Sequence, residues 1–249
     1  MSGVAKVSGT TYNETQESQM RDLYHEELDA ISDQLVEMTR LAGSAMARAT
    51  TALLDADLKL AESVIEADDQ IDDLQHDLES RALDLLARQQ PVATDLRTIV
   101  TSLRMSADLE RMGDYALHVA QMARRRYPSS AIPADLRATV LQMGQVAERI
   151  VAKAGSVIAS KDVSAALEFE HDDDEMDRLH QELLRRILRK DSEHSVEAAV
   201  DATLCARYYE RFADHAVSVA RRVIFLATGE YATPEQEAAA ARTAGTSPV

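Results

Sequence analysis

The segment Glu110-Arg111-Met112-Gly113-Asp114-Tyr115-Ala116 is the most informative stretch of this chain, because a close copy follows as Glu210-Arg211-Phe212-Ala213-Asp214-His215-Ala216. The two copies are offset by 100 residues, from 110 to 210. In each copy a second acid follows the first after four positions, and on a helix this spacing places both carboxylates on one face. We therefore expect two similar halves, each carrying the same acidic pair on a helix.

A second acidic pair is repeated in the same way. Asp68 and Asp72 have the form acid-x-x-x-acid, and they recur as Asp173 and Asp177, 105 residues later. Carboxylates bind hard cations, and all-oxygen ligation favours magnesium, manganese or iron over copper or cysteine-bound zinc. The predicted metal ligands are therefore Asp68, Asp72, Glu110, Asp114, Asp173, Asp177, Glu210 and Asp214.

The acids are expected to share helix faces with apolar side chains. At about 100° per residue, Glu110 and Asp114 fall on the face of Leu96, Ile99, Leu103 and Leu117. Glu210 and Asp214 fall on the face of Val196, Val200 and Val217. An ionised carboxylate on such a face needs a partner or water, because burying it alone is very unfavourable. Bound cations are one solution. Ion pairs with Arg111 and Arg211 are the alternative. The sequence leaves bound cations and ion pairs both open. The histidines near the second set, His171, His180 and His215, are not counted as ligands.

Composition predicts an all-α protein. The chain has 249 residues, of which 45% are hydrophobic, with only three Phe and no Trp, so the core must be largely aliphatic. Five Pro and eight Gly are few for this length, which favours long helices over a turn-rich β architecture. The single cysteine, Cys205, excludes an internal disulfide and a cysteine-cluster metal site.

Charge and hydropathy limit the possible partners and location. A net charge of −16 argues against a general nucleic-acid binder, because phosphates would be repelled. No run of 18 apolar residues is present to span a membrane, and the amino-terminal stretch lacks the apolar core of a signal peptide. We therefore expect a cytoplasmic protein.

The apolar spacing predicts six helices arranged as three, a linker and three. Pro91 and Pro133 mark helix starts, the linker begins at Tyr127-Pro128-Ser129-Ser130, and Gly229 marks the end of the last helix. The expected architecture is two tandem, pseudo-symmetric three-helix bundles. The expected division is a disordered amino-terminal tail (1–18), a first bundle (19–127), a linker (128–133), a second bundle (134–230) and a carboxyl-terminal tail (231–249).

At the level of motifs, the chain resembles the PhoU family of phosphate-signalling regulators. Gln90-Pro-Val-Ala-Thr-Asp-Leu-Arg97, followed by Asp108-Leu-Glu-Arg-Met-Gly-Asp114, resembles the first-half signature, and Tyr209-Glu-Arg-Phe-Ala-Asp-His-Ala216 resembles the second-half signature. The likeness spans roughly residues 23–230. It implies two symmetric three-helix bundles, multinuclear metal clusters at the acidic motifs named above, and no catalytic residues.

The resemblance also implies a function. Such a protein restrains the phosphate-starvation two-component response and phosphate uptake when phosphate is plentiful. Its implied partners are a phosphate-sensing histidine kinase and the ATP-binding subunit of the phosphate ABC importer, with membrane association only through them and with pairing of two copies left open. The competing hypotheses are an iron oxidoreductase or storage protein with a carboxylate-bridged centre, for which Glu168-x-x-His171 is a single partial motif, and a metal-free scaffold.

Overall fold

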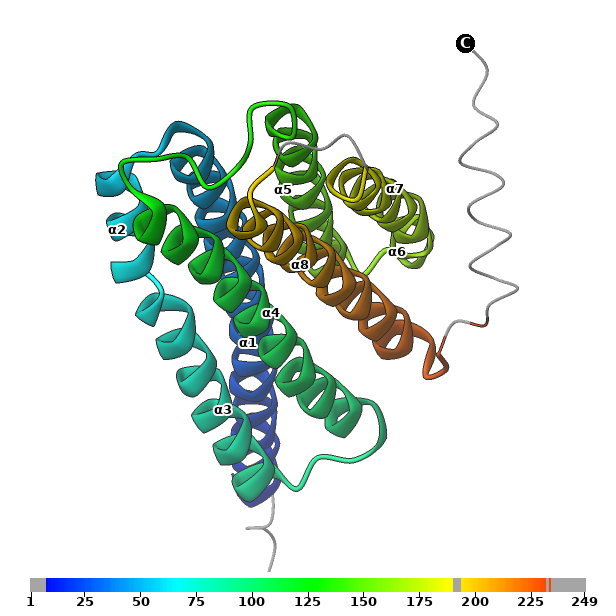
Figure 1. Cartoon of the computed structure of the whole chain (residues 1–249). Coiled ribbons are helices and arrows are strands. Elements are labelled where there is room, and N and C mark those ends of the chain that lie inside the picture. Colours follow the sequence, from blue (N-terminus) through cyan, green and yellow to red (C-terminus); the bar gives the residue numbers. More distant parts are fainter. Residues whose placement is uncertain (1–7, 190–193, 232, 234–249) are drawn as a thin grey trace, which may run out of the picture.

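The computed structural model describes residues 8–189, 194–231 and 233, and within them it contains helices joined by short loops. Two helical halves lie side by side, which confirms the predicted all-α, pseudo-symmetric fold (Figure 1). The described part of the chain contains eight helices: α1 (Ser8–Asp55), α2 (Leu58–Glu66), α3 (Asp69–Gln89), α4 (Ala93–Arg126), α5 (Arg137–Ser160), α6 (Val163–Leu167), α7 (Phe169–Ile187) and α8 (Val196–Thr228).

The two helices that carry the repeated motif are long and uninterrupted. The motif of the first half lies on α4, with 34 residues, and that of the second half on α8, with 33 residues. The side chain of Ser195 caps the start of α8 by accepting a hydrogen bond from the Ala198 N–H. Gly229, at φ +81°, ends α8 in the left-handed conformation that glycine adopts readily. The predicted limits of this helix are confirmed.

The second expected helix of each half is broken into two pieces. Asp57 caps α2 and Asp162 caps α6, each by accepting backbone N–H groups with its side chain, and these two residues are again 105 apart. The chain then bends at Ala67–Asp68 before α3 and at Glu168 before α7. The bend places Asp68 at the start of α3, directly before the first turn that holds Asp72.

The amino-terminal helix is longer than predicted. Helix α1 begins at Ser8, so the expectation of a disordered tail over 1–18 is wrong for residues 8–18. No glycine or proline interrupts residues 10–42, so nothing in that stretch terminates the helix. Residues 1–7, and all of the predicted carboxyl-terminal tail except Tyr231 and Thr233, lie outside the described residues.

The two halves pack through two antiparallel helix pairs, α1 with α5 and α4 with α8. In the α1–α5 pair, a Cβ on Gly43 would lie 2.9 Å from Val151 Cγ1, and a Cβ on Gly144 would lie 2.7 Å from Thr50 Cγ2. These contacts are equivalent under an offset of 101 residues, from 43 to 144 and from 50 to 151. Small residues thus let the helices approach closely at symmetric points, and the buried side chains of both halves form one continuous core.

Two expected core residues of α8 are on the surface. The side chains of Val196 and Val200 are 81% and 51% exposed, whereas the buried stripe begins with Ala202, Cys205 and Ala206. The stripe begins with small residues and continues with the large side chains Tyr209 and Phe212. Hydropathy alone ranks alanine below valine and so does not locate its start. None of the described helices combines the length and apolar character that crossing a bilayer requires.

Candidate functional site

The first acidic cluster consists of Asp68, Asp72, Glu110 and Asp114, and close packing of α3 on α4 brings it together. At the centre of this contact, a Cβ on Gly113 would lie 2.9 Å from the Cδ1 atom of Ile71. Glycine at this position therefore lets the start of α3 approach α4. Because Ile71 adjoins Asp72 and Gly113 adjoins Asp114, the acids of the two helices become neighbours.

The carboxylates of the first cluster influence one another electrostatically. The pKa of Asp68 is raised from 3.8 to about 6, first by burial and then by the charges of Asp72, Asp114 and Asp69. The pKa of Glu110 is also raised, first by burial and then by Asp114, with Arg111 opposing the shift. Both helices therefore contribute to one negatively charged site in which ionisation is unfavourable.

The second acidic cluster consists of Asp173, Asp177, Glu210 and Asp214, on α7 and α8. At the positions that correspond to Ile71 and Gly113 it has Met176 and Ala213, both fully buried. Burial and the charge of Asp214 raise the pKa of Glu210, Asp177 adds a smaller rise, and the cations Arg207 and His180 oppose it. Asp177 of α7 and Glu210 of α8 therefore act on each other across the two helices.

The arginines inside the motifs form the ion pairs that were expected as an alternative to cations. Arg111 Nη1 donates to Asp114 Oδ2 at 3.0 Å, and Arg211 Nη1 donates to Asp214 Oδ2 at 3.1 Å. Arg111 Nε also lies 3.6 Å from Glu110 Oε2. One guanidinium per motif offsets only part of the acidic charge, since each cluster holds four carboxylates.

Arg207 is a functional neighbour that the sequence reasoning missed. Its Nη1 donates to both carboxylate oxygens of Glu210, one turn away on α8. The i,i+3 spacing of Arg207 and Glu210 was visible in the sequence. A comparison restricted to the acids of the two halves does not detect it.

The oxygen donors of the clusters suit a hard divalent cation, but they are not drawn together around one point. Among the described residues, no three or more His, Cys, Asp or Glu side chains form a group that could hold a metal ion in its present geometry. A cation would have to pull the carboxylates inward. The raised pKa values of Asp68, Asp72 and Glu110, which come from burial and mutual repulsion, show that the first cluster would gain from positive charge.

The histidines near the second cluster have different surroundings. His180 acts electrostatically on Glu210. His215 instead faces the first half, where its Nδ1 lies 3.1 Å from Asp108 Oδ1. Asp108 also accepts a hydrogen bond from Arg222 Nε at 2.6 Å, so this carboxylate joins α4 to α8. The side chain of His171 lies outside the described residues.

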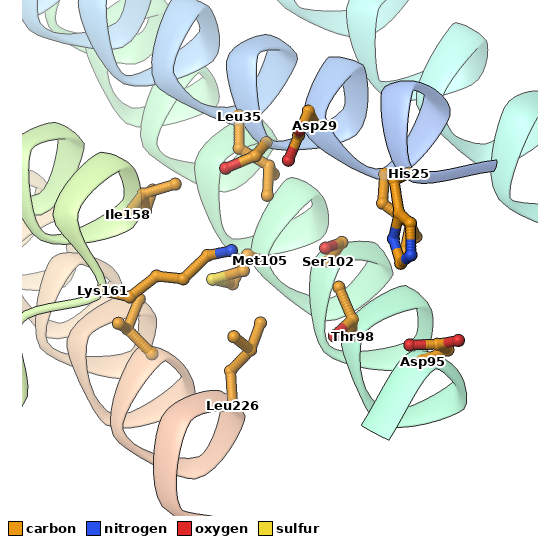
Figure 2. Close-up of a pocket in the computed structure, with 13 residues that line it drawn as sticks. His25, Asp29, Leu35, Asp95, Thr98, Ser102, Met105, Ile158, Lys161 and Leu226 are labelled. Atoms are coloured by element: carbon orange, nitrogen blue, oxygen red, sulfur yellow. The ribbon is translucent and has the colours of Figure 1, made fainter. Parts of the chain in front are cut away.

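The hollows of the molecule do not coincide with the acidic clusters. A cavity of about 200 Å³ lies between α1, α4 and α8 at the end of α5, and Figure 2 shows Lys161 extending into it toward Met105. A shallower groove of about 710 Å³ follows the α1–α5 contact. None of the eight acids lines either hollow.

The partial iron motif also has other partners. The carboxylate of Glu168 lies 3.7 Å from the ammonium group of Lys153. The same ammonium lies 3.3 Å from Asp172, which adjoins the second cluster in sequence. The structure therefore gives Glu168 an ion-pairing role in the second half.

Comparison with known proteins reveals close relatives over most of the chain. The family model described as the PhoU domain matches residues 35–123 and 140–223. The phosphate-specific transport system accessory protein PhoU homolog 2 of Mycobacterium tuberculosis is 50% identical over 212 residues, covering 85% of this chain and all of that protein. Homolog 1 of Mycobacterium leprae is 48% identical, covering 88% of this chain and 97% of that protein.

Solved structures show the same fold. The crystal structure of PhoU from Pseudomonas aeruginosa superimposes with a TM-score of 0.75 at 30% identity, covering 83% of this chain and all of that one. The phosphate transport system regulatory protein PhoU from Streptococcus pneumoniae gives a TM-score of 0.76 at 25% identity, covering 84% and 99%. Because the family match spans both halves and the relatives share up to half of their residues with it, this chain belongs to the PhoU domain family.

Proposed function

We propose that this chain is a cytoplasmic regulator of phosphate uptake that restrains the phosphate-starvation two-component response when phosphate is plentiful. The observation that carries the proposal is a PhoU domain match over both halves, each of which carries the repeated acidic motif. Relatives named as phosphate-specific transport system accessory proteins support the same role.

In this proposal the acidic clusters hold divalent cations, with iron, manganese and magnesium as the candidates that all-oxygen ligation favours. Asp68, Asp72, Glu110 and Asp114 would hold a cation in the first half. Asp173, Asp177, Glu210 and Asp214 would do so in the second. A bound cation supplies positive charge to carboxylates that are otherwise held close together at an energetic cost.

Removal of metal tests the cation part of the proposal. A cation that binds only the folded state stabilises it, so EDTA is expected to lower the melting temperature of protein purified without chelator. Replacing both Asp114 and Asp214 with Asn is expected to abolish the difference between treated and untreated protein. Equal melting temperatures with and without EDTA in the unsubstituted protein, combined with no metal in elemental analysis, would contradict it.

The proposed partners are a phosphate-sensing histidine kinase and the ATP-binding subunit of the phosphate ABC importer. The test is a pull-down of the tagged full chain from phosphate-replete and phosphate-starved cells, with antibodies against each partner. We expect both partners to be retained, more strongly when phosphate is plentiful. A matched pair of variants separates the cluster from general charge: Asp114→Asn is expected to weaken retention, and Asp84→Asn, on the exposed face of α3, is not.

An oxidoreductase or storage function for a carboxylate-bridged iron centre is the competing hypothesis. The ion pair between Glu168 and Lys153 does not favour it. Oxygen consumption measured after addition of ferrous iron distinguishes the two functions. Catalytic turnover would replace the regulatory proposal, whereas stoichiometric binding without turnover agrees with it.

A further inference from the structure

The cavity of about 200 Å³ is shared by the two halves of the molecule, because α1 and α4 line it from the first half and α5 and α8 from the second. Its floor is apolar and buried, with Leu35, Met105, Ile158 and Val223 among its residues. Sites for drug-sized ligands have volumes of about 300–1,000 Å³. This cavity therefore suits a smaller molecule with an aliphatic part.

Charged side chains of both signs stand at the exposed rim of the cavity. Lys161, at the end of α5, extends into it from one side, and Asp29 of α1 and Asp95 of α4 lie on its other walls, beside His25 (Figure 2). Within the part of the chain that the structure describes, Lys161 and Asp29 form no ion pair with each other or with another side chain. Opposite charges therefore face the same cavity without meeting.

The hydroxyl group of Ser102 is a further polar group of the cavity. Ser102 is only 3% exposed, and it lines the cavity from α4. The neighbouring hydroxyls of α4 are bonded within the helix, since Thr98 donates to the Thr94 carbonyl at 3.0 Å and Ser106 to the Leu103 carbonyl at 2.9 Å. The Ser102 hydroxyl makes no such bond to the described residues. It is therefore available to a ligand, and leaving a hydroxyl in such a place unbonded is unfavourable.

The repeat shows that the backbone does not require a lysine at the end of α5. Lys161 has φ 55°, and the residue 105 positions earlier, Ala56 at the end of α1, has φ 51°. Both therefore adopt the left-handed conformation, and alanine is sufficient for it. Ser102 likewise corresponds to Ala202 at the offset of 100 residues. The ammonium and the hydroxyl are thus present at this cavity and absent from the equivalent positions of the repeat.

We infer that the cavity binds a small aliphatic zwitterion of the amino-acid type. Its carboxylate pairs with the ammonium of Lys161 and accepts a hydrogen bond from Ser102, its ammonium faces Asp29 and Asp95, and its side chain lies on the apolar floor. A simple anion or cation would meet one favourable charge and one repulsive charge, whereas a zwitterion meets both favourably. This inference goes beyond the proposed regulatory function and does not depend on metal binding.

The experiment is isothermal titration calorimetry of the full chain with L-leucine and L-valine. Three molecules related to leucine test each part of it: 4-methylpentanoate lacks the ammonium, 3-methylbutylamine lacks the carboxylate, and glycine lacks the side chain. We expect one binding site for leucine or valine and affinities about tenfold lower for each of these three molecules, because each loses a charged or apolar contact.

Two variants assign the charges of the ligand to the two sides of the cavity. Lys161→Ala and Asp29→Asn are each expected to weaken amino-acid binding about tenfold. Lys161→Ala should leave the affinity for 3-methylbutylamine unchanged, and Asp29→Asn should leave that for 4-methylpentanoate unchanged. Asp29 is substituted rather than Asp95 because Asp95 lies in the first turn of α4, where a carboxylate also stabilises the helix.

Matched controls separate binding from folding. Lys59→Ala removes the same charge from an exposed position on α2 that does not line the cavity, and it should leave binding unchanged. Because Ala56 adopts the same backbone conformation as Lys161, Lys161→Ala is expected to keep the melting temperature of the ligand-free protein. Circular dichroism checks the helix content and the melting temperature of every variant.

Three results would overturn the inference. One is the absence of binding by both amino acids. Another is binding of 4-methylpentanoate or inorganic phosphate as tightly as leucine, which would make the cavity an anion site. The third is amino-acid binding that Lys161→Ala and Asp29→Asn leave unchanged, which would place the ligand elsewhere. None of these results bears on the cation binding proposed above, which the EDTA experiment tests separately.

Discussion

The Tyr209 hydroxyl on α8 lies 2.6 Å from Thr50 Oγ1 on α1, in the buried contact between the two halves. Thr50 Oγ1 also lies 2.8 Å from the carbonyl oxygen of Met46, which can only accept a hydrogen bond. The single threonine proton is therefore directed to Met46, and Tyr209 is the donor to Thr50. This bond joins segments that are 159 residues apart in the sequence.

Removing the acceptor, Thr50, should lower the free energy of unfolding more than removing the donor hydroxyl of Tyr209. Thr50→Val leaves the buried Tyr209 hydroxyl without a partner, which costs about 1–3 kcal/mol. Tyr209→Phe loses one hydrogen bond but leaves Thr50 bonded to Met46, which costs about 1 kcal/mol. Urea unfolding of both variants and of the double variant measures the coupling. Strictly additive losses would show that the bond does not contribute to stability.

The contact between Gly113 and Ile71 sets the spacing of α3 and α4 at the first cluster. Gly113→Ala would place a Cβ 2.9 Å from Ile71 Cδ1, and such overpacking costs about 1–3 kcal/mol. Ile71→Val removes Cδ1 and alone costs about 0.5–1.5 kcal/mol. The double variant is therefore expected to be more stable than the sum of the single losses predicts. Thermal unfolding of the four proteins tests this, and a double variant at or below the sum would contradict it.

Asp108 links the halves through Arg222 and His215. The side chains of Asp108 and Arg222 are 12% and 25% exposed, so their ion pair is largely shielded from water. Asp108→Asn should destabilise the protein by about 2 kcal/mol, because the guanidinium loses its charged partner in a partly buried place. The control is Asp84→Asn, which removes an exposed pair with Arg88 and should cost less than about 1 kcal/mol. If urea unfolding gives the same loss of unfolding free energy for Asp108→Asn and Asp84→Asn, the contact of Asp108 with Arg222 does not contribute more than an exposed ion pair.

The raised pKa of Asp68 predicts a pH dependence in protein stripped of metal. Burial, followed by the neighbouring carboxylates, raises this pKa from 3.8 to about 6 in the folded state. Between these two pH values the folded protein binds more protons than the unfolded chain, so stability falls as pH rises from about 4 to about 6 and then levels off. Asp68→Asn should remove this part of the slope and stabilise the metal-free protein at pH 7.5 by about 1 kcal/mol, allowing for solvent screening.

The measurement for Asp68 is urea unfolding at several pH values between 4.5 and 7.5, with EDTA present throughout. The difference between Asp68→Asn and the unsubstituted protein isolates this carboxyl group from the others that titrate. If that difference is constant across the range, the raised pKa is refuted.

Much of the fold could be predicted from the sequence because helices are governed by local patterns. Ser195 and Gly229 mark the start and end of α8 through capping and a left-handed turn, both of which depend on single residue types. The division at Tyr127-Pro128 and the repeat of acidic pairs are equally visible. The start of α1 is not predicted from the sequence, because the polar composition of residues 8–18 is typical of disorder.

Which helix face is buried was harder to predict. The apolar pattern predicts Val196 and Val200 in the core, but both are exposed, and the first buried apolar residues of α8 are Ala202, Cys205 and Ala206. The close approach of neighbouring helices selects alanine and glycine at such positions, and hydropathy does not register that requirement. The same limitation hid the role of Gly113, whose missing side chain admits Ile71.

The sequence by itself determined the helical class, the twofold repeat and the acids of each motif, because spacing along one helix fixes which side chains share a face. Only the tertiary structure decided that Asp68 of α3 lies near Glu110 of α4 and that Asp108 of α4 pairs with Arg222 of α8. Distances between helices depend on how side chains interlock across the contact, and periodicity along the chain carries no record of that packing.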